Sequence, residues 1–348
     1  MTGANPKSAA KAIDALRRGW TVAVTGESCT IGLVAIETCS DVVAASGILL
    51  SASRAATLKL ANQFAAADTA LPVLIARPAD LDMALSLAIA DPALDMRYPM
   101  KGPFLAQALP DTGAAMAAME LAREAGLLPA FLVVAADLAD VYTTPADVAA
   151  FQDASQLRIA ARARLPVSAS SDAELIAFRS IADAADHVAL VVGKRDGSTP
   201  VVRLHSECLT GDVLGSLKCD CGPQLHEALH QIAGAGWGVL LYLRQEGRGI
   251  GLVNKLRAYA LQDQGFDTVD ANIRLGFAVD ARDFAVAAQM LQLLSVDRIR
   301  LLTNNPEKVA GLEAEGVVVI ERLPLKIAAN PHNAQYLETK RDRTGHKL

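Results

Sequence analysis

The chain has 348 residues, of which 52% are apolar and 20% charged, and its formal net charge is −5. This length suits two domains with sizeable cores, and the composition excludes global disorder. The negative charge argues against a protein that coats nucleic acid. The N-terminal residues lack the order of a signal peptide, and no apolar run is long enough to cross a bilayer. Five cysteines without an export signal indicate reduced thiols, so we expect a soluble cytoplasmic protein.

The first half of the chain carries little reactive chemistry. It contains no histidine and no tight group of acidic residues that would hold a metal ion. Cys29 and Cys39 stand alone, and we expect both to be buried as small apolar residues. The pattern predicts helices at 9–18, 81–89 and 114–125, mostly helix over 36–66, strands at 20–24, 48–50, 72–75 and 131–134, and an irregular segment at 91–110.

A linker is predicted at residues 166–171, which are small and polar. We therefore expect domains at 1–168 and 172–348, with a short helix starting at Asp172. The second half alternates strands and helices, as an α/β domain does. Strands are predicted at 187–193, 199–204, 238–243, 300–302 and 317–320, and helices near Pro223, from Leu252, at 284–294 and around Lys308. The polar tail at 330–348 is expected to cover the surface.

Three cysteines, Cys208, Cys219 and Cys221, lie within one short segment of this half. Thiolates are soft ligands that suit zinc, and three protein ligands plus a water are typical of a catalytic site. A structural site would need a fourth ligand, and that alternative stays open. The nearby histidines that could supply it are His205, His226 and His230.

Two polar turns in the second half indicate a nucleotide. Residues 244–251 follow an apolar strand and precede a helix, an arrangement whose backbone N–H groups can bind an anion. Arg248 adds a guanidinium suited to phosphate, although the glycines could serve only the backbone angles of a tight turn. Residues 303–306 form a second strand-to-helix turn, followed by Lys308. Beside the cysteines, the two turns favour nucleotide binding.

Six motifs of the second half occur in the order of a known family. They are Arg203-Leu-His-Ser-Glu-Cys-Leu-Thr-Gly-Asp, Cys219-Asp-Cys-Gly, Arg244-Gln-Glu-Gly-Arg, Arg257-Ala-Tyr-Ala-Leu-Gln-Asp, Leu275-Gly-Phe-Ala and Leu301-Leu-Thr-Asn-Asn-Pro-Glu-Lys. Together they resemble GTP cyclohydrolase II, the family that opens the guanine ring of GTP at the start of riboflavin biosynthesis. Six motifs in order are far more specific than any lone motif.

This resemblance implies one zinc ion per chain and magnesium with the triphosphate of GTP. The implied zinc ligands are Cys208, Cys219 and Cys221. The implied nucleotide contacts are Arg203, Leu204, His205, Ser206, Glu207, Gln224, Glu246, Gly247, Arg248, Thr268, Thr303 and Lys308.

The implied catalytic residues are Tyr259, Asp280 and Arg282. In the family, Arg282 would attack the α-phosphate and Asp280 would be its base, whereas a plain structural interpretation has this pair capping the next helix. Because guanidinium holds its proton tightly, we expect Arg282 to stabilise charge rather than attack. Glu207 or Tyr259 would assist the water that attacks the purine ring.

The first half resembles, in three short motifs, a dihydroxybutanone phosphate synthase domain. The motifs are Ala12-Ile-Asp-Ala-Leu-Arg-Arg-Gly, Gly32-Leu-Val-Ala-Ile-Glu and Met119-Glu-Leu-Ala-Arg-Glu-Ala-Gly-Leu. That family's acidic cluster falls on residues 25–31, and its Gly-His-Thr-Glu motif falls on 113–116, read here as Gly-Ala-Ala-Met. Since both chemical centres are missing, we expect an inactive domain of similar fold.

The expected protein is therefore α/β with two domains, an N-terminal α+β synthase-like domain and a C-terminal α/β GTP cyclohydrolase II-like zinc domain. The expected reaction converts GTP to a diaminopyrimidinone ribosyl phosphate with release of formate and pyrophosphate. A non-catalytic GTP-binding regulator with a structural zinc is the alternative, and Tyr259, Asp280 and Arg282 together weigh against it. A bifunctional enzyme is disfavoured by the eroded first half. The family suggests a homodimer, and no nucleic-acid or membrane partner is expected.

Overall fold

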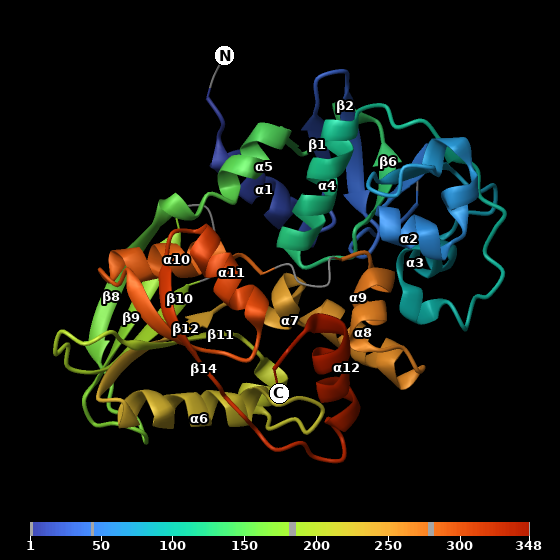
Figure 1. The fold of residues 1–348 in the computed structure, drawn as a ribbon. Coiled ribbons are helices and arrows are strands. Elements are labelled where there is room, and N and C mark those ends of the chain that lie inside the picture. The colour runs from blue at the N-terminus through green and yellow to red at the C-terminus, as the bar shows by residue number, and fades with distance from the viewer. Residues whose placement is uncertain (1–2, 43–44, 181–185, 278–281, 348) are drawn as a thin grey trace. The chain divides into compact units, whose positions relative to one another are not determined.

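The chain forms two compact units in the computed structural model, which describes residues 3–42, 45–180, 186–277 and 282–347. Unit 1 comprises residues 1–153 and 250–281, and unit 2 comprises 154–249 and 282–348. Each unit contains a seven-stranded sheet with helices (Figure 1). The expected α/β class is confirmed, but unit 1 also takes a helical segment from the second half of the chain.

Unit 1 is built on a largely antiparallel sheet with the strand order β5-β4-β3-β6-β2-β1-β7, in which β1 and β7 are the one parallel pair among the described strands. Its elements are α1 Pro6–Arg17, β1 Val22–Thr25, β2 Thr30–Ala35, β3 Gly47–Leu50, α2 Ala52–Thr57, β4 Val73–Ala76, α3 Met83–Ala90, β5 Ala106–Gln107, α4 Thr112–Ala125, β6 Ala130–Val134, β7 Val141–Thr143, α5 Pro145–Phe151, α8 Gly251–Asp263 and α9 Thr268–Leu275. Most predicted elements are confirmed, but the prediction of mostly helix over 36–66 is wrong, because α2 is the only α-helix described there, and β2 lies where no strand was predicted.

Helices α8 and α9 belong to unit 1 because their apolar faces complete one of its cores. Leu261 and Leu275 are buried in the same cluster as residues of β3, β4 and β6. Arg257 on α8 also pairs with Glu37 at 3.1 Å and with Asp91 at 3.0 Å. These side chains are largely shielded from water, so the pairs fix the orientation of α8 in unit 1.

Unit 2 is built on a mixed sheet with the strand order β14-β13-β11-β12-β10-β9-β8. Its elements are β8 Leu157–Arg164, β9 Ala173–Ser180, β10 His187–Gly193, β11 Val201–Ser206, α6 Cys221–Gly234, β12 Trp237–Leu243, α7 Glu246–Gly249, α10 Phe284–Leu293, β13 Arg298–Leu302, α11 Pro306–Ala314, β14 Val318–Leu323 and α12 Ala334–Thr344. Strands β14, β13, β11 and β12 are parallel, and β10, β9 and β8 continue the sheet in antiparallel order.

The parallel strands of unit 2 create a switch point between β11 and β13. Strand β11 leads through α6 to β12 on one side, whereas β13 leads through α11 to β14 on the other. We call the edge at which β11, β12 and β13 end the carboxyl edge. Connections that leave adjacent strands in opposite directions open a crevice there, and such crevices commonly hold ligands.

The predicted linker at 166–171 is wrong, and so is the predicted helix from Asp172. Residues 166–171 lie in the connection between β8 and β9, which pair along their length in antiparallel order. Val167 and Ser170 form a bridge within this connection. The small polar residues therefore make a turn inside the sheet of unit 2. The chain passes from one compact unit to the other at 153/154, 249/250 and 281/282 instead.

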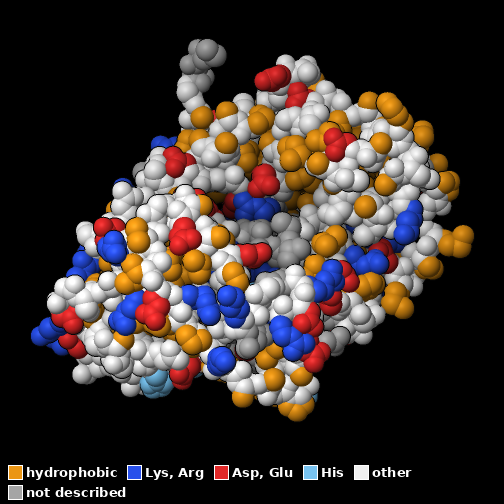
Figure 2. Space-filling view, in the orientation of Figure 1, with side chains coloured by type: hydrophobic (Ala, Val, Ile, Leu, Met, Phe, Trp, Pro, Cys, Tyr) orange, Lys and Arg blue, Asp and Glu red, His pale blue; other side chains and the backbone are white. Residues whose placement is uncertain are grey.

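The surface of unit 1 carries several exposed apolar side chains. Figure 2 shows hydrophobic side chains over the region of α2 and α3, at the right of the view. The segments that flank these helices expose Phe64, Met96, Met100 and Leu105. Within the described ranges, no helix is both long enough and apolar enough to cross a membrane.

Candidate functional site

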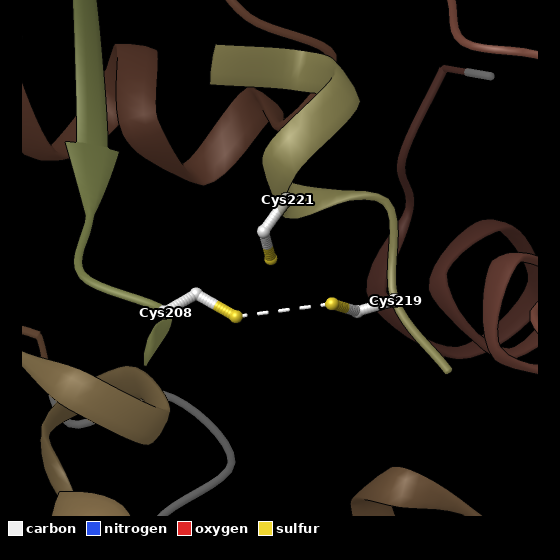
Figure 3. A group of neighbouring side chains, drawn as sticks. All are labelled: Cys208, Cys219 and Cys221. Carbon is white, nitrogen blue, oxygen red and sulfur yellow. Dashed lines mark hydrogen bonds between the residues drawn. The ribbon is translucent and has the colours of Figure 1, made fainter. Parts of the chain in front are cut away.

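Three thiols converge at the carboxyl edge of unit 2 (Figure 3). Cys208 lies two residues after the end of β11, while Cys219 lies two residues before α6 and Cys221 begins it. Their sulfur atoms lie within 4.8 Å of one another, and the Sγ atoms of Cys208 and Cys219 are 3.8 Å apart. Among the described residues, these three cysteines are the one cluster of at least three potential metal ligands close enough together to hold an ion.

The surroundings of Cys219 and Cys221 disfavour their thiolate forms. Hydrogen bonding to Cys208 raises the pKa of the Cys219 thiol. Hydrogen bonds with Cys208 and Cys219, together with burial, raise the pKa of the Cys221 thiol well above its ordinary value. A bound divalent cation would compensate the charge of the thiolates and so reverse this effect. Three soft sulfur donors fit zinc by ligand type.

Gly211 leaves the space that the three sulfur atoms need. It lies in the one-turn π-helix Leu209–Val213, which folds the chain back over the cysteines. A Cβ atom at residue 211 would lie 2.7 Å from the Sγ of Cys219, 2.9 Å from the Cβ of Cys221 and 3.0 Å from the Sγ of Cys208. Any side chain there would therefore displace the cysteines.

We expect Gly211→Ala to weaken metal retention by about tenfold or more, because the added methyl group collides with the three cysteines. Zinc transfer to a colorimetric chelator measures the effect. The control is Gly234→Ala, since a Cβ atom at residue 234 of α6 meets nothing within 4 Å. Equal zinc release from the two variants would contradict the steric argument.

A buried carboxylate, Asp212, orders the backbone at Cys208. Its Oδ2 accepts hydrogen bonds from the Cys208 backbone N–H at 3.0 Å and from the Tyr242 hydroxyl at 2.9 Å. Its Oδ1 lies 3.0 Å from His205 Nε2, and the His205 ring stacks on Tyr242. Burial lowers the pKa of His205, so the neutral ring donates from Nε2 and leaves Nδ1 as an acceptor. This network fixes where the Cys208 thiol lies.

Two buried cations lie at the switch point. Arg203 on β11 donates from Nη1 to the Leu302 carbonyl at 3.0 Å and from Nη2 to Gln224 Oε1 at 2.5 Å. Lys308 on α11 donates from Nζ to the Leu204 carbonyl at 2.8 Å. Burial lowers the pKa of Arg203 to about 10, which still leaves it charged at neutral pH. These two cations at the switch point suit an anionic ligand.

Buried polar atoms without a partner lie at the same edge. Among the described residues, the hydrogen-bonding atoms Ser206 Oγ, Arg203 Nε and Asn305 Nδ2 are buried and have no partner. Thr303 follows β13, and its hydroxyl accepts the Asn305 backbone N–H at 3.0 Å. Since buried polar groups normally have partners, these atoms indicate a site that a polar ligand completes.

The glycine-rich turn after β12 is tied to the cysteine segment. Glu246 accepts the backbone N–H of Leu209 at 2.7 Å, and Glu207 accepts Arg244 Nε at 2.7 Å. Gly247 and Arg248 both have a positive φ of 62°. This left-handed backbone is common for glycine but uncommon for arginine, and such conformations concentrate at ligand sites.

Comparison with known proteins agrees with this geometry. The family model of GTP cyclohydrolase II matches residues 158–324. GTP cyclohydrolase-2 from Escherichia coli O45:K1 (strain S88 / ExPEC) is 57% identical over 194 residues, which cover 56% of this chain and 98% of the relative. The protein of the same name from Escherichia coli (strain K12 / DH10B) gives the same values. The chain belongs to the GTP cyclohydrolase II family.

A solved structure matches at lower similarity. RibBX, a two-domain 3,4-dihydroxy-2-butanone 4-phosphate synthase from A. baumannii, aligns over 92% of this chain and 99% of its own. The sequence identity is 18% and the TM-score 0.30. At these values the match supports no inference about this chain.

Not all residues implied by the GTP cyclohydrolase II resemblance lie in unit 2. Tyr259 on α8 and Thr268 at the start of α9 belong to unit 1, where Thr268 Oγ1 accepts Gln262 Nε2 at 3.0 Å. Asp280 lies outside the described residues. Arg282 precedes α10 in unit 2, and the other implied zinc and nucleotide residues also lie in unit 2.

The sequence interpretation gave no role to several residues that surround the cysteines. Gly211 and Asp212 lie inside a motif of the GTP cyclohydrolase II family, so their position was a usable signal. Asn333 and Lys340 lie in the tail that was expected only to cover the surface. That expectation is incomplete, because both residues are buried and contact the segment 219–220.

Proposed function

We propose that this chain hydrolyses GTP to a diaminopyrimidinone ribosyl phosphate, with release of formate and pyrophosphate, in the first step of riboflavin biosynthesis. The observation that carries the proposal is the convergence of three thiols at the same sheet edge as the buried cations Arg203 and Lys308, in a member of the GTP cyclohydrolase II family. The crevice would bind the nucleotide, and the thiols would hold the metal ion.

The proposed metal is zinc, held by Cys208, Cys219 and Cys221. When bound, zinc supplies Lewis acidity for the attack of water on the purine ring. The protein's own contribution is to fix the ligands. Asp212 holds the backbone of Cys208, and the absence of a side chain at Gly211 keeps the cysteines together.

The nucleotide contacts remain those implied by the family, and the contacts of unit 2 support several of them. Arg203 and Lys308 are buried cations at the switch point, suited to phosphate oxygens. Ser206 offers a hydroxyl that has no partner among the described residues. Glu207 is held by Arg244 next to Cys208, where a carboxylate can exchange protons with a reacting water.

Magnesium would accompany the triphosphate, because reactions at phosphorus usually need the negative charge of the phosphates to be neutralised. We further propose a homodimer, as the family suggests. The five cysteines without disulfide bonds suit a reducing compartment, so we place the enzyme in the cytoplasm.

The direct test is incubation of the purified chain with GTP and magnesium. Formate and pyrophosphate are followed together with the ultraviolet spectrum of the product. We expect both products in equal amounts. GTP binding without either product would instead support the rival function, a GTP-binding regulator with a structural zinc.

We also propose that the N-terminal half is a degenerate synthase-like domain. The two stretches that would carry the synthase centre lie together in unit 1, because Asp111 accepts the backbone N–H groups of Ser28 at 2.7 Å and Ala114 at 2.8 Å. Ala114 is fully buried, and a Cβ atom at Gly26 would lie 2.2 Å from Asp111. The buried methyl group of Ala114 stands where the resemblance would place a metal-binding histidine, and the carboxylate of Asp111 is already bound to the backbone.

We therefore expect no conversion of ribulose 5-phosphate by the full chain, because no carboxylate–histidine set for magnesium and sugar phosphate is present there. Formation of dihydroxybutanone phosphate is measured with magnesium present and compared with a protein-free blank. Product above that blank would refute the assignment. Cyclohydrolase activity in the same preparation is the control for intact protein.

A further inference from the structure

The C-terminal segment returns to the cysteines although it lies beyond the family match, which ends at residue 324. Asn330 Nδ2 donates to the Leu217 carbonyl at 3.3 Å, and Asn333 Nδ2 donates to the Cys219 carbonyl at 3.4 Å. Near the end of the chain, the Lys347 backbone N–H donates to the Asn304 carbonyl at 2.9 Å. These contacts join the tail to the segment 217–219 and to the turn after β13.

A further contact of the C-terminal segment, and the strongest, is a buried ion pair. Lys340 on α12 donates from Nζ to Asp220 Oδ1 at 2.8 Å, and the two side chains are only 11% and 3% exposed. Asp220 lies between Cys219 and Cys221 in the sequence, and its Oδ2 accepts Gln224 Nε2 at 2.5 Å. The Lys340 ammonium also lies 4.4 Å from the centre of the Tyr336 ring.

Charge explains why this contact matters for the cysteines. A metal site of three thiolates concentrates negative charge, and Asp220 adds a buried carboxylate inside the same segment. Lys340 supplies the charge that balances Asp220, at a position where water cannot. Without Lys340 the buried carboxylate would lose its counter-charge, which is strongly destabilising for the segment that carries Cys219 and Cys221.

We propose that residues 330–347 form a latch that holds Cys219 and Cys221 in their metal-binding geometry, with Lys340 as its positioning residue. Asn333 of the latch contacts the backbone carbonyl of Cys219, and Lys340 contacts the carboxylate of Asp220, which lies between Cys219 and Cys221. The inference rests on the proposed metal site. It adds that retention of the metal depends on a segment beyond residue 324, where the match of the family model ends.

The test compares Lys340→Met with Arg341→Met in the full chain loaded with zinc. Both variants remove one positive charge from α12, but Arg341 is exposed and pairs with Asp342. We expect Lys340→Met to release zinc to a colorimetric chelator about tenfold faster or more, the usual effect of losing a group that orients a ligand. Arg341→Met should release zinc at the parent rate, and Lys340→Arg should restore most of the retention.

Thermal unfolding of the metal-free proteins separates a latch from a general loss of stability. A latch predicts faster zinc release while the metal-free Lys340→Met protein unfolds near the parent temperature. If Lys340→Met does not fold, Asn333→Ala is measured, because it removes the weaker contact to Cys219 and leaves the ion pair in place.

Two outcomes would overturn the latch. One is zinc release from Lys340→Met, or from the substitute Asn333→Ala, at the parent rate. The other is zinc release that is faster than in the parent protein and equally fast from Lys340→Met and Arg341→Met. A parent protein that binds no zinc at all would instead refute the proposed metal site, so the two failures are distinguishable.

Discussion

Replacing Cys219 by serine is expected to remove the metal ion and to slow formate release by more than about a hundredfold, beyond the usual effect of losing a group that only orients a ligand. Serine keeps the size of the side chain but replaces the soft sulfur donor with a hydroxyl that stays protonated at neutral pH. Cys219 is buried and its Sγ lies 3.8 Å from that of Cys208, so the loss changes the donor set directly. Zinc content and formate are measured on the same preparation.

The control for this variant is Cys29→Ser, because Cys29 lies in unit 1 and packs against its core instead of joining the cluster. Pyrophosphate and GMP are followed in parallel, since phosphate chemistry need not require the thiols. Continued pyrophosphate release with accumulation of GMP would separate the two steps. Formate from Cys219→Ser at the parent rate would exclude the cysteines from ring opening.

The sequence predicted the cysteine site because its signals are local. Strands β10 and β12 are apolar runs, and three cysteines within one short segment leave few arrangements other than a shared site. Cys208 lies just after β11, Cys219 lies just before α6 and Cys221 begins it, so the topology alone brings the three thiols to the same edge of the sheet. The order of the six motifs then indicated the family to which the site belongs.

The wrong predictions for residues 166–180 arose because tertiary contacts there override the local sequence pattern. Strand β8 is mostly exposed and carries Arg158, Arg162 and Arg164, which weakens its hydrophobic signal. Strand β9 begins with Ala-Glu-Leu, residues that favour helix, yet pairs with β8 and β10 on its two sides. Neither strand could be identified without its neighbours.

Long-range contacts were also beyond a sequence interpretation. The pair Lys340–Asp220 spans 120 residues, and a lysine in a polar helix normally lies in solvent. Helix α8 was expected within the second domain, but Arg257 pairs with Glu37 and Asp91 of unit 1. No spacing in the sequence indicates such partners.

Replacing Arg282 by alanine is expected to lower pyrophosphate release by about 100- to 1,000-fold, the usual effect of removing one group that stabilises transition-state charge. Arg282 precedes Asp283, whose carbonyl accepts Gln245 Nε2 at 3.3 Å, and Gln245 follows β12. This contact ties the segment to the carboxyl edge, where Cys208 also lies. Burial is the main cause of the lowered pKa of Arg203, and the positive charge of Arg282 adds to this lowering.

Two further variants decide what Arg282 does. Arg298→Ala is the control, since Arg298 is an exposed residue at the amino end of β13, opposite the carboxyl edge. Arg282→Lys keeps a positive charge but not the planar guanidinium. Charge stabilisation predicts that the lysine variant retains part of the pyrophosphate rate, because the transferring group still faces a cation. Covalent attack by the guanidinium predicts that lysine is as inactive as alanine and that the parent protein forms a nucleotide adduct that mass spectrometry detects.

Formate release from Arg282→Ala then gives the order of the two steps. If attack at the α-phosphate must come first, formate falls together with pyrophosphate, because the ring opens only on the product of that attack. If ring opening is independent, formate continues while pyrophosphate stops, since the three cysteines of the metal site are unchanged in this variant. Pyrophosphate released by Arg282→Ala at the parent rate would remove Arg282 from the phosphate chemistry altogether, and the crevice cations Arg203 and Lys308 would then be the residues to replace next.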